Sequence, residues 1–122
     1  MHAFSYSAPA TAAEAVALLA QYGQDARILA GGTDLLVQMR TGRRRPAHLI
    51  DIKKVPEVNE IRWESSALHL GSAVPCYRVY GDSAVGAAYP ALAEVAALIG
   101  GIQIQGRASI GGNLCNSAPS AD

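Results

Sequence analysis

Two glycine-rich segments hold the residues whose types and spacing could bind a ligand. The first contains Gly31, Gly32 and Thr33, and the second is the run "SIGGN" from Ser109 to Asn113. Glycine accepts positive φ and has no Cβ, so a tight turn there leaves backbone amides open to close approach. Free amides at the start of a helix bind anions, phosphate above all. The two segments therefore indicate a phosphate site that is held from two sides.

Each glycine turn taken alone is a weak signal. A tight connection without any ligand explains either turn, and a β-bulge or a hairpin corner explains the second one. The spacing matches neither the GxGxxG dinucleotide pattern nor the GxxxxGK[ST] phosphate loop, which argues against those two binding folds. The occurrence of both turns in one small chain favours a shared pyrophosphate, approached from one side by each turn.

The chain up to about residue 55 has the pattern of a βαβαβ unit. Thr11 and Glu14 form a capping box for a helix that ends at Gly23. Thr33 is placed to cap a shorter helix, over about 33–41. Compact runs typical of short strands occupy three segments: 4–7, 26–29 and 48–52. Strands that alternate with helices predict parallel pairing with right-handed crossovers.

Beyond that point the pattern changes to a mixture of helices and antiparallel strands. The segment 60–72 alternates with a period of two on both sides of a serine pair, which predicts a hairpin. A helical turn is expected over 75–80, and Pro90 starts a confident helical pattern that stops at a glycine pair. The glycine-rich segment 102–122 is predicted to favour β structure.

These patterns predict an α+β fold with two parts. Residues 1–55 would form a small βαβαβ N-terminal subdomain, and residues 56–122 would form part of an α+β subdomain with antiparallel strands. The chain stops on a polar, turn-like segment, and both a natural domain and a truncated one can end in this way.

The composition fits one globular core and argues against several classes of protein. Half of the 122 residues are hydrophobic and 16% are charged, with ten basic and ten acidic side chains. This balance argues against a disordered chain and gives no overall field toward nucleic acid or an anionic membrane. The cluster Arg43-Arg44-Arg45 is interpreted as a solvated loop, with docking to an acidic partner or a nucleotide phosphate as the alternative.

Compartment and metal chemistry follow from what the sequence contains. No apolar run approaches the roughly 20 residues of a membrane span, and no secretory signal is recognisable. Cys76 and Cys115 lie far apart and form no CxxC pair, so we expect no metal site and a cytoplasmic location. No Ser-His-Asp or Cys-His arrangement is evident, and no catalytic residue is predicted.

The two glycine segments, in this order, resemble those of the FAD-binding medium subunit of the molybdenum hydroxylases. That family includes xanthine dehydrogenase and aerobic carbon monoxide dehydrogenase. The resemblance covers the whole chain and includes the opening pattern F-x-Y-x-x-P-x-T-x-x-E-A and the runs "HLIDI", "LHLGSAVP" and "YPALAEVAALIGGIQIQGRASIGGNL". It implies the FAD-binding fold of the molybdenum hydroxylase and vanillyl-alcohol oxidase type, with FAD as the cofactor.

The resemblance also implies which residues contact FAD. The first segment would wrap the pyrophosphate, and the second would contact the pyrophosphate and the ribityl chain from the other side. Asp122 falls where the family has a carboxylate that hydrogen-bonds the cofactor. Ile99 falls where some members place a side chain against the flavin, although packing on the apolar face of the preceding helix is the favoured alternative. The implied cofactor-binding residues are Leu29, Ala30, Gly31, Gly32, Thr33, Asp34, Leu35, Ile99, Ser109, Ile110, Gly111, Gly112, Asn113 and Asp122.

As to function, the resemblance implies an electron-transfer subunit of an oxidoreductase. Electrons would leave the substrate at a molybdenum centre in a large subunit, cross two [2Fe-2S] clusters in a small subunit, and reach FAD in this subunit. FAD would pass them to an external acceptor. The family's medium subunits are considerably longer, so the chain resembles their N-terminal portion, which could be inactive in isolation.

Two alternatives remain open at this point. The chain could be a cofactor-free remnant, or a module of the same fold that docks partner subunits. It could also be another flavoenzyme of the same broad fold, such as a cell-wall precursor reductase, although the segment "SIGGNLCNSAPSAD" argues against that family.

Overall fold

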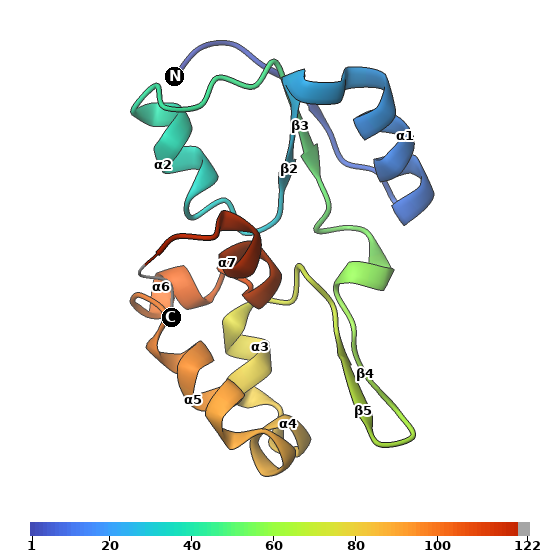
Figure 1. The fold of residues 1–122 in the computed structure, drawn as a ribbon, viewed down its shortest axis with the longest axis vertical. Coiled ribbons are helices and arrows are strands. Elements are labelled where there is room, and N and C mark those ends of the chain that lie inside the picture. Colours follow the sequence, from blue (N-terminus) through green and yellow to red (C-terminus); the bar gives the residue numbers. More distant parts are fainter. Residues whose placement is uncertain (120–122) are drawn as a thin grey trace.

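The computed structural model describes residues 1–119, which form two units, one above the other in Figure 1. The upper unit has the predicted βαβαβ order. Its elements are β1 (Ser5–Ser7), α1 (Ala12–Tyr22), β2 (Ala26–Leu29), α2 (Leu35–Arg40) and β3 (His48–Asp51). The alternation of strands and helices in the sequence is therefore confirmed.

The three upper strands form a parallel sheet in the order β1-β3-β2. The central strand β3 is buried along its whole length, because it has a neighbour on each side. Successive side chains of a strand point to opposite faces. Accordingly, Ile50 packs in one cluster with Ala15 of α1, whereas Leu49 packs in another with Met39 of α2. The two helices thus cover opposite faces of the sheet (Figure 1).

Helix α1 begins and ends as its sequence predicts. The Thr11 hydroxyl accepts a hydrogen bond from the Glu14 amide at 3.2 Å, and the Glu14 carboxylate accepts one from the Ala10 amide at 2.9 Å. The carboxylate thus binds the amide before Thr11 rather than that of Thr11 itself. The helix ends at Gly23, whose φ is 53°.

The lower unit consists of a hairpin and a group of short helices. The elements are β4 (Ile61–Glu64), β5 (Ala67–Leu70), α3 (Cys76–Gly81), α4 (Ser83–Ala88), α5 (Pro90–Leu98), α6 (Ile102–Gln105) and α7 (Ile110–Asn116). The antiparallel hairpin, the helical turn after Pro75 and the helix at Pro90 are confirmed. Helix α4 was not anticipated. Its Asp82 cap accepts a hydrogen bond from the Val85 amide at 3.0 Å.

The prediction of β structure after residue 101 is wrong, because α6 and α7 are helical. In α6 the buried Gln105 donates through Nε2 to the Ala97 carbonyl at 2.7 Å, which ties the short helix to the end of α5. In α7 the Ser109 hydroxyl accepts from the Gly112 amide at 3.1 Å and caps the first turn. A period of two in "IQIQ" and a pair of glycines both disfavour a helix locally, and these tertiary contacts override that preference.

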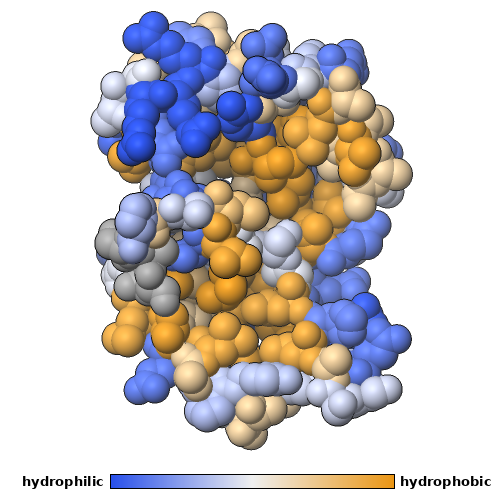
Figure 2. All heavy atoms as spheres, viewed as in Figure 1, coloured by the Kyte–Doolittle hydropathy of each residue, from blue (hydrophilic) through white to orange (hydrophobic). Residues whose placement is uncertain are grey.

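Hydrophobic residues reach the surface over much of the lower unit on the face that Figure 2 shows. The most exposed large hydrophobic residues of the lower unit are Leu98, Ile102 and Leu114, each at least 70% exposed. Among residues 1–119, no helix is long and apolar enough to cross a membrane.

Candidate functional site

The carboxyl ends of the parallel strands point toward the lower unit, and the two glycine segments meet there. Gly31 follows β2, and Arg107 precedes α7. The Arg107 side chain donates through Nε to the Gly31 carbonyl at 3.4 Å. A second contact joins the helices that follow the two turns, because Gln38 donates through Nε2 to the Asn116 carboxamide oxygen at 3.1 Å. Segments far apart in the sequence thus form one junction (Figure 1).

The first turn has free amide donors. Within residues 1–119, the backbone amides of Gly31, Gly32 and Thr33 donate to no protein acceptor. Gly32 has a φ of 82°, the region that glycine adopts without strain. Helix α2 starts at Leu35 with Asp34 as its N-cap, and no side chain caps it. The prediction that Thr33 caps this helix is therefore wrong, and its hydroxyl makes no capping bond.

The second turn is the start of α7 rather than a bulge or a hairpin corner. Ser109 is 3% exposed and uses its hydroxyl to cap the helix. The Gly111 amide donates to no protein acceptor in the described part of the chain, whereas the Ile110 amide faces the Val74 carbonyl in an isolated antiparallel bridge between Pro75 and Ser109. The Asn113 amide is used within the helix, where it donates to the Ser109 carbonyl at 2.9 Å. Because α2 and α7 are short, these individual amides would contribute more to anion binding than a helix dipole would.

The first glycine of each pair makes room for protein backbone. A Cβ on Gly31 would lie 2.0 Å from the Arg107 carbonyl oxygen, and a Cβ on Gly111 would lie 2.5 Å from the Ser72 carbonyl oxygen. Access for a ligand and a tight turn are therefore not the whole reason for these glycines. The structure shows that Gly31 and Gly111 are also needed for close packing between segments.

The remaining predicted residues of the first segment contribute mainly to packing. Leu29 and Leu35 lie in the cluster around Met39. Ala30 packs against the core on the α1 side of the sheet, and Asp34 is exposed. Backbone atoms, rather than side chains, are therefore what this segment offers a ligand.

Ile99 is part of the core of the lower unit. Ile99 is 8% exposed and lies in the core cluster of the lower unit with Val74 and Val79. This agrees with the packing alternative, and contact with a flavin stays a prediction. Ile110 packs against the same cluster. Asp122 lies outside the described residues.

A charged cluster beside the first turn was missed by the sequence analysis. The Asp51 carboxylate accepts from the Tyr6 hydroxyl at 2.5 Å, from the Lys53 ammonium at 2.7 Å and from the Lys53 amide at 2.9 Å. Lys53 also donates through Nζ to the Ala30 carbonyl at 3.1 Å. The position of Asp51 at the carboxyl end of a parallel strand could have identified it, since ligands bind at that edge of such sheets.

The cluster shifts two pKa values in opposite directions. Burial alone would raise the pKa of Asp51, but the hydrogen bonds from Lys53 and Tyr6 and the Lys53 charge outweigh it. The net pKa lies below the ordinary aspartate value. The hydrogen bond that Tyr6 donates to Asp51 is the main reason why the pKa of Tyr6 is raised. Asp51 is therefore a stable anion that pairs with Lys53 at neutral pH.

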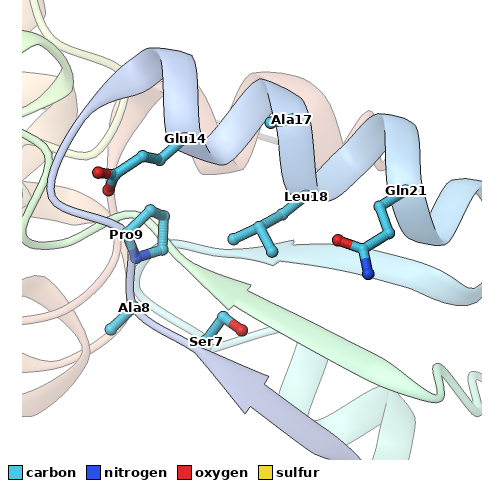
Figure 3. A pocket seen from close by; sticks show the side chains of 7 residues that line it. All are labelled: Ser7, Ala8, Pro9, Glu14, Ala17, Leu18 and Gln21. Carbon is cyan, nitrogen blue, oxygen red and sulfur yellow. The ribbon is translucent and has the colours of Figure 1, made fainter.

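Two cavities lie in different places. One of about 290 Å³ lies at the junction, and its lining includes Gly31, Lys53, Arg78 and Arg107. The other, about 450 Å³, is a groove between the end of β1 and helix α1, shown in Figure 3. The groove contains no residue of either glycine segment, and the Glu14 carboxylate at its rim is already used in the helix cap.

Comparison with known proteins identifies the family to which the chain belongs. Residues 2–122 match the family described as the FAD binding domain in molybdopterin dehydrogenase. The chain belongs to this family. Over 119 residues it is 42% identical to the carbon monoxide dehydrogenase medium chain of Hydrogenophaga pseudoflava, a match that covers 98% of this chain and 42% of the relative.

Two further relatives agree with that assignment. The xanthine dehydrogenase FAD-binding subunit of Escherichia coli O157:H7 is 42% identical over 119 residues, which is 97% of this chain and 40% of the relative. A crystallised carbon monoxide dehydrogenase from H. pseudoflava superimposes with a TM-score of 0.96 at 41% identity, covering 99% of this chain and 42% of that one. The chain thus spans about two fifths of the length of these relatives.

FAD is the cofactor of this family, and the residues at the junction fit it. Free amides at Gly31–Thr33 and at Gly111 suit phosphate oxygens, which accept hydrogen bonds and carry negative charge. No group of three or more His, Cys, Asp or Glu side chains in residues 1–119 is placed to hold a metal ion.

Proposed function

We propose that this chain is the part of an oxidoreductase subunit that grips the FAD pyrophosphate. The subunit would carry electrons from iron–sulfur clusters through FAD to an external acceptor. The observation that carries the proposal is the meeting of two turns, at Gly31–Thr33 and at Gly111, that each leave at least one backbone amide without a protein acceptor. Bound FAD would supply the redox chemistry, and the chain would supply position and hydrogen bonds.

Each turn has a separate part in the proposed grip. The amides of Gly31, Gly32 and Thr33 would donate to phosphate oxygens, with the Thr33 hydroxyl beside them. The Gly111 amide would donate from the other side, and the Asn113 carboxamide would reach the pyrophosphate or the ribityl chain. No side chain of the chain needs to act as a general acid or base in this role.

The proposed partners are a molybdenum-cofactor large subunit and a [2Fe-2S] small subunit, in the cytoplasm. Two observations support association with further protein. The relatives are named as a medium chain and as an FAD-binding subunit, which implies other chains in their complexes. In the lower unit, Leu98, Ile102 and Leu114 are each at least 70% exposed, and exposed apolar surface often marks a site of protein contact.

A flavin-binding experiment tests the proposal. Purified protein should be yellow or should take up added FAD with quenching of the flavin fluorescence, and the released cofactor should be FAD rather than FMN. Gly32→Val should abolish this binding, because the new side chain is strained at a φ of 82° and crowds the amides. Gly86→Val is the matched control, since a Cβ at Gly86 meets nothing within 4 Å.

Two results would contradict the proposal. A folded, colourless protein that takes up no FAD would favour the docking-module alternative. Full FAD binding by a folded Gly32→Val variant would show that the first turn does not hold the pyrophosphate.

A further inference from the structure

We propose that Lys53 and Arg107 are positioning residues that orient two successive peptide groups of the first glycine turn toward the cofactor. This inference rests on the proposed function, and it concerns residues outside both glycine segments. Lys53 donates through Nζ to the Ala30 carbonyl at 3.1 Å, and Arg107 donates through Nε to the Gly31 carbonyl at 3.4 Å.

Peptide geometry turns these two contacts into control of the amides. In a trans peptide the carbonyl and the following N–H lie in one plane and point in opposite directions. A cation on the Ala30 carbonyl therefore directs the Gly31 N–H away from Lys53. A cation on the Gly31 carbonyl directs the Gly32 N–H away from Arg107 in the same manner.

Such control is needed because the turn contains two glycines. Glycine has several backbone wells of similar energy, so its peptide groups can rotate when nothing holds them. The amides of Gly31 and Gly32 have no protein acceptor among residues 1–119 that could hold them from the other side. The two carbonyl contacts are thus what fixes these donors before any ligand is bound.

Lys53 is itself held in place by the cluster around Asp51. The Asp51 carboxylate lies 2.7 Å from the Lys53 ammonium, and its side chain is only 8% exposed. The Tyr6 hydroxyl holds the same carboxylate oxygen from β1. A chain of contacts therefore runs from the parallel sheet to the Ala30 carbonyl, and the sheet sets the orientation of the turn.

Arg107 contributes from the second unit. Its carbonyl oxygen occupies the space beside Gly31 where a Cβ would lie, and its side chain binds the Gly31 carbonyl. One residue thus contacts the turn through both backbone and side chain. Orientation of the Gly32 amide therefore depends on correct docking of the two units.

Variants that each remove one of the two cationic side chains test this inference. Lys53→Met and Arg107→Met should each weaken FAD binding by about tenfold, which is roughly the value of one hydrogen bond to a charged group. Lys53→Arg and Arg107→Lys keep a cationic donor and should restore most of the affinity. Lys54→Met and Arg62→Met are matched controls, since Lys54 lies next to Lys53 in the sequence and Arg62 is an exposed arginine of the hairpin.

Two spectroscopic readouts separate positioning from a general loss of structure. In the apoprotein, the nitrogen and proton chemical shifts of the Gly31 and Gly32 amides should change in the Met variants and return in the conservative ones. In the complex, the phosphorus NMR shifts of bound FAD should move in parallel. If Lys53→Met is unstable because Asp51 loses its partner, the double variant with Asp51→Asn removes the unpaired carboxylate.

The outcomes distinguish this inference from the proposed function. Absence of FAD binding by the wild-type protein would refute the proposed function, and the amide shifts of the apoprotein would still test the orientation. Wild-type affinity and unchanged glycine shifts in both Met variants would overturn the inference while leaving the proposed function intact.

Discussion

Asp51 shows at the scale of one residue how a buried charge is kept. Its carboxylate is almost fully removed from water, which by itself disfavours ionisation. A hydroxyl, an ammonium and an amide each donate to it, and together they outweigh the cost of burial. Removal of any one of these donors would leave the buried Asp51 carboxylate incompletely paired.

The lowered pKa of Asp51 predicts a specific loss of stability in acid. Because the folded-state pKa lies below the unfolded one, the unfolded chain binds more protons as the pH falls through this range. The contribution of Asp51 is therefore complete above about pH 5 and is lost below about pH 4. Urea denaturation should show that, below about pH 4, the free energy of unfolding falls more steeply for wild type than for Asp51→Asn. Parallel pH profiles for the two proteins would contradict this account.

At the scale of elements, the second glycine segment depends on the N-cap of helix α7. Ser109 is buried, caps the helix through its hydroxyl and accepts the Asn113 amide through its carbonyl. The free amide of Gly111 is thus presented by one ordered helical turn. A glycine pair would otherwise make this turn unstable.

Ser109→Ala should therefore lower the free energy of unfolding by about 1 kcal/mol, the usual cost of a lost N-cap. FAD affinity should fall as well, because the amides at the start of α7 lose their fixed geometry. Ser83→Ala is the control, since Ser83 starts α4 but Asp82 caps that helix. Equal stability and affinity in the two variants would show that the Ser109 hydroxyl is not needed.

Elements that carry their own end signals could be predicted from the sequence. Helix α1 has a capping box and a terminal glycine, α5 starts with a proline, and the strands are short and compact. Helices α6 and α7 could not be predicted in this way. Their helical form depends on contacts such as the packing of Gly111 on Ser72, which local propensity does not contain.

The candidate site could be predicted only where its residues form a local sequence pattern. Glycine pairs between a strand and a helix are visible as a local pattern, so both turns were found. Lys53 and Arg107 act on backbone carbonyls that are 23 and 76 positions away in the sequence. Both residues lie beside motifs that the sequence shows, but nothing in those motifs indicates a contact with the first turn, and only the folded structure brings them to it.

The whole molecule is joined by close backbone contacts at the glycine turns. Gly31 packs on the Arg107 backbone, and the Arg107 side chain donates to the Gly31 carbonyl at 3.4 Å. Ala73, from the second half of the chain, lies in the core cluster of the upper unit. We propose a subdomain boundary near residue 55, as the sequence predicts, with these contacts holding the two parts together.

Gly31→Ala should separate the two units slightly. Its methyl group would lie 2.0 Å from the Arg107 carbonyl oxygen, so the backbone must move. We expect a loss of about 1–3 kcal/mol in the free energy of unfolding, typical of overpacking, together with weaker FAD binding. Gly81→Ala provides the comparison, because a Cβ there meets nothing within 4 Å. Unchanged stability and FAD affinity in Gly31→Ala would mean that this contact is not tight in solution.

The contact between Gly31 and Arg107 also has a consequence for folding kinetics. It closes a loop of 76 positions, and such distant pairings form slowly because chain entropy is lost before the contact is gained. The upper sheet can assemble from segments earlier in the chain, whereas the two turns meet only after the second unit has docked. Appearance of the flavin signal during refolding in the presence of FAD would therefore time the last step of folding, later than the recovery of helical circular dichroism.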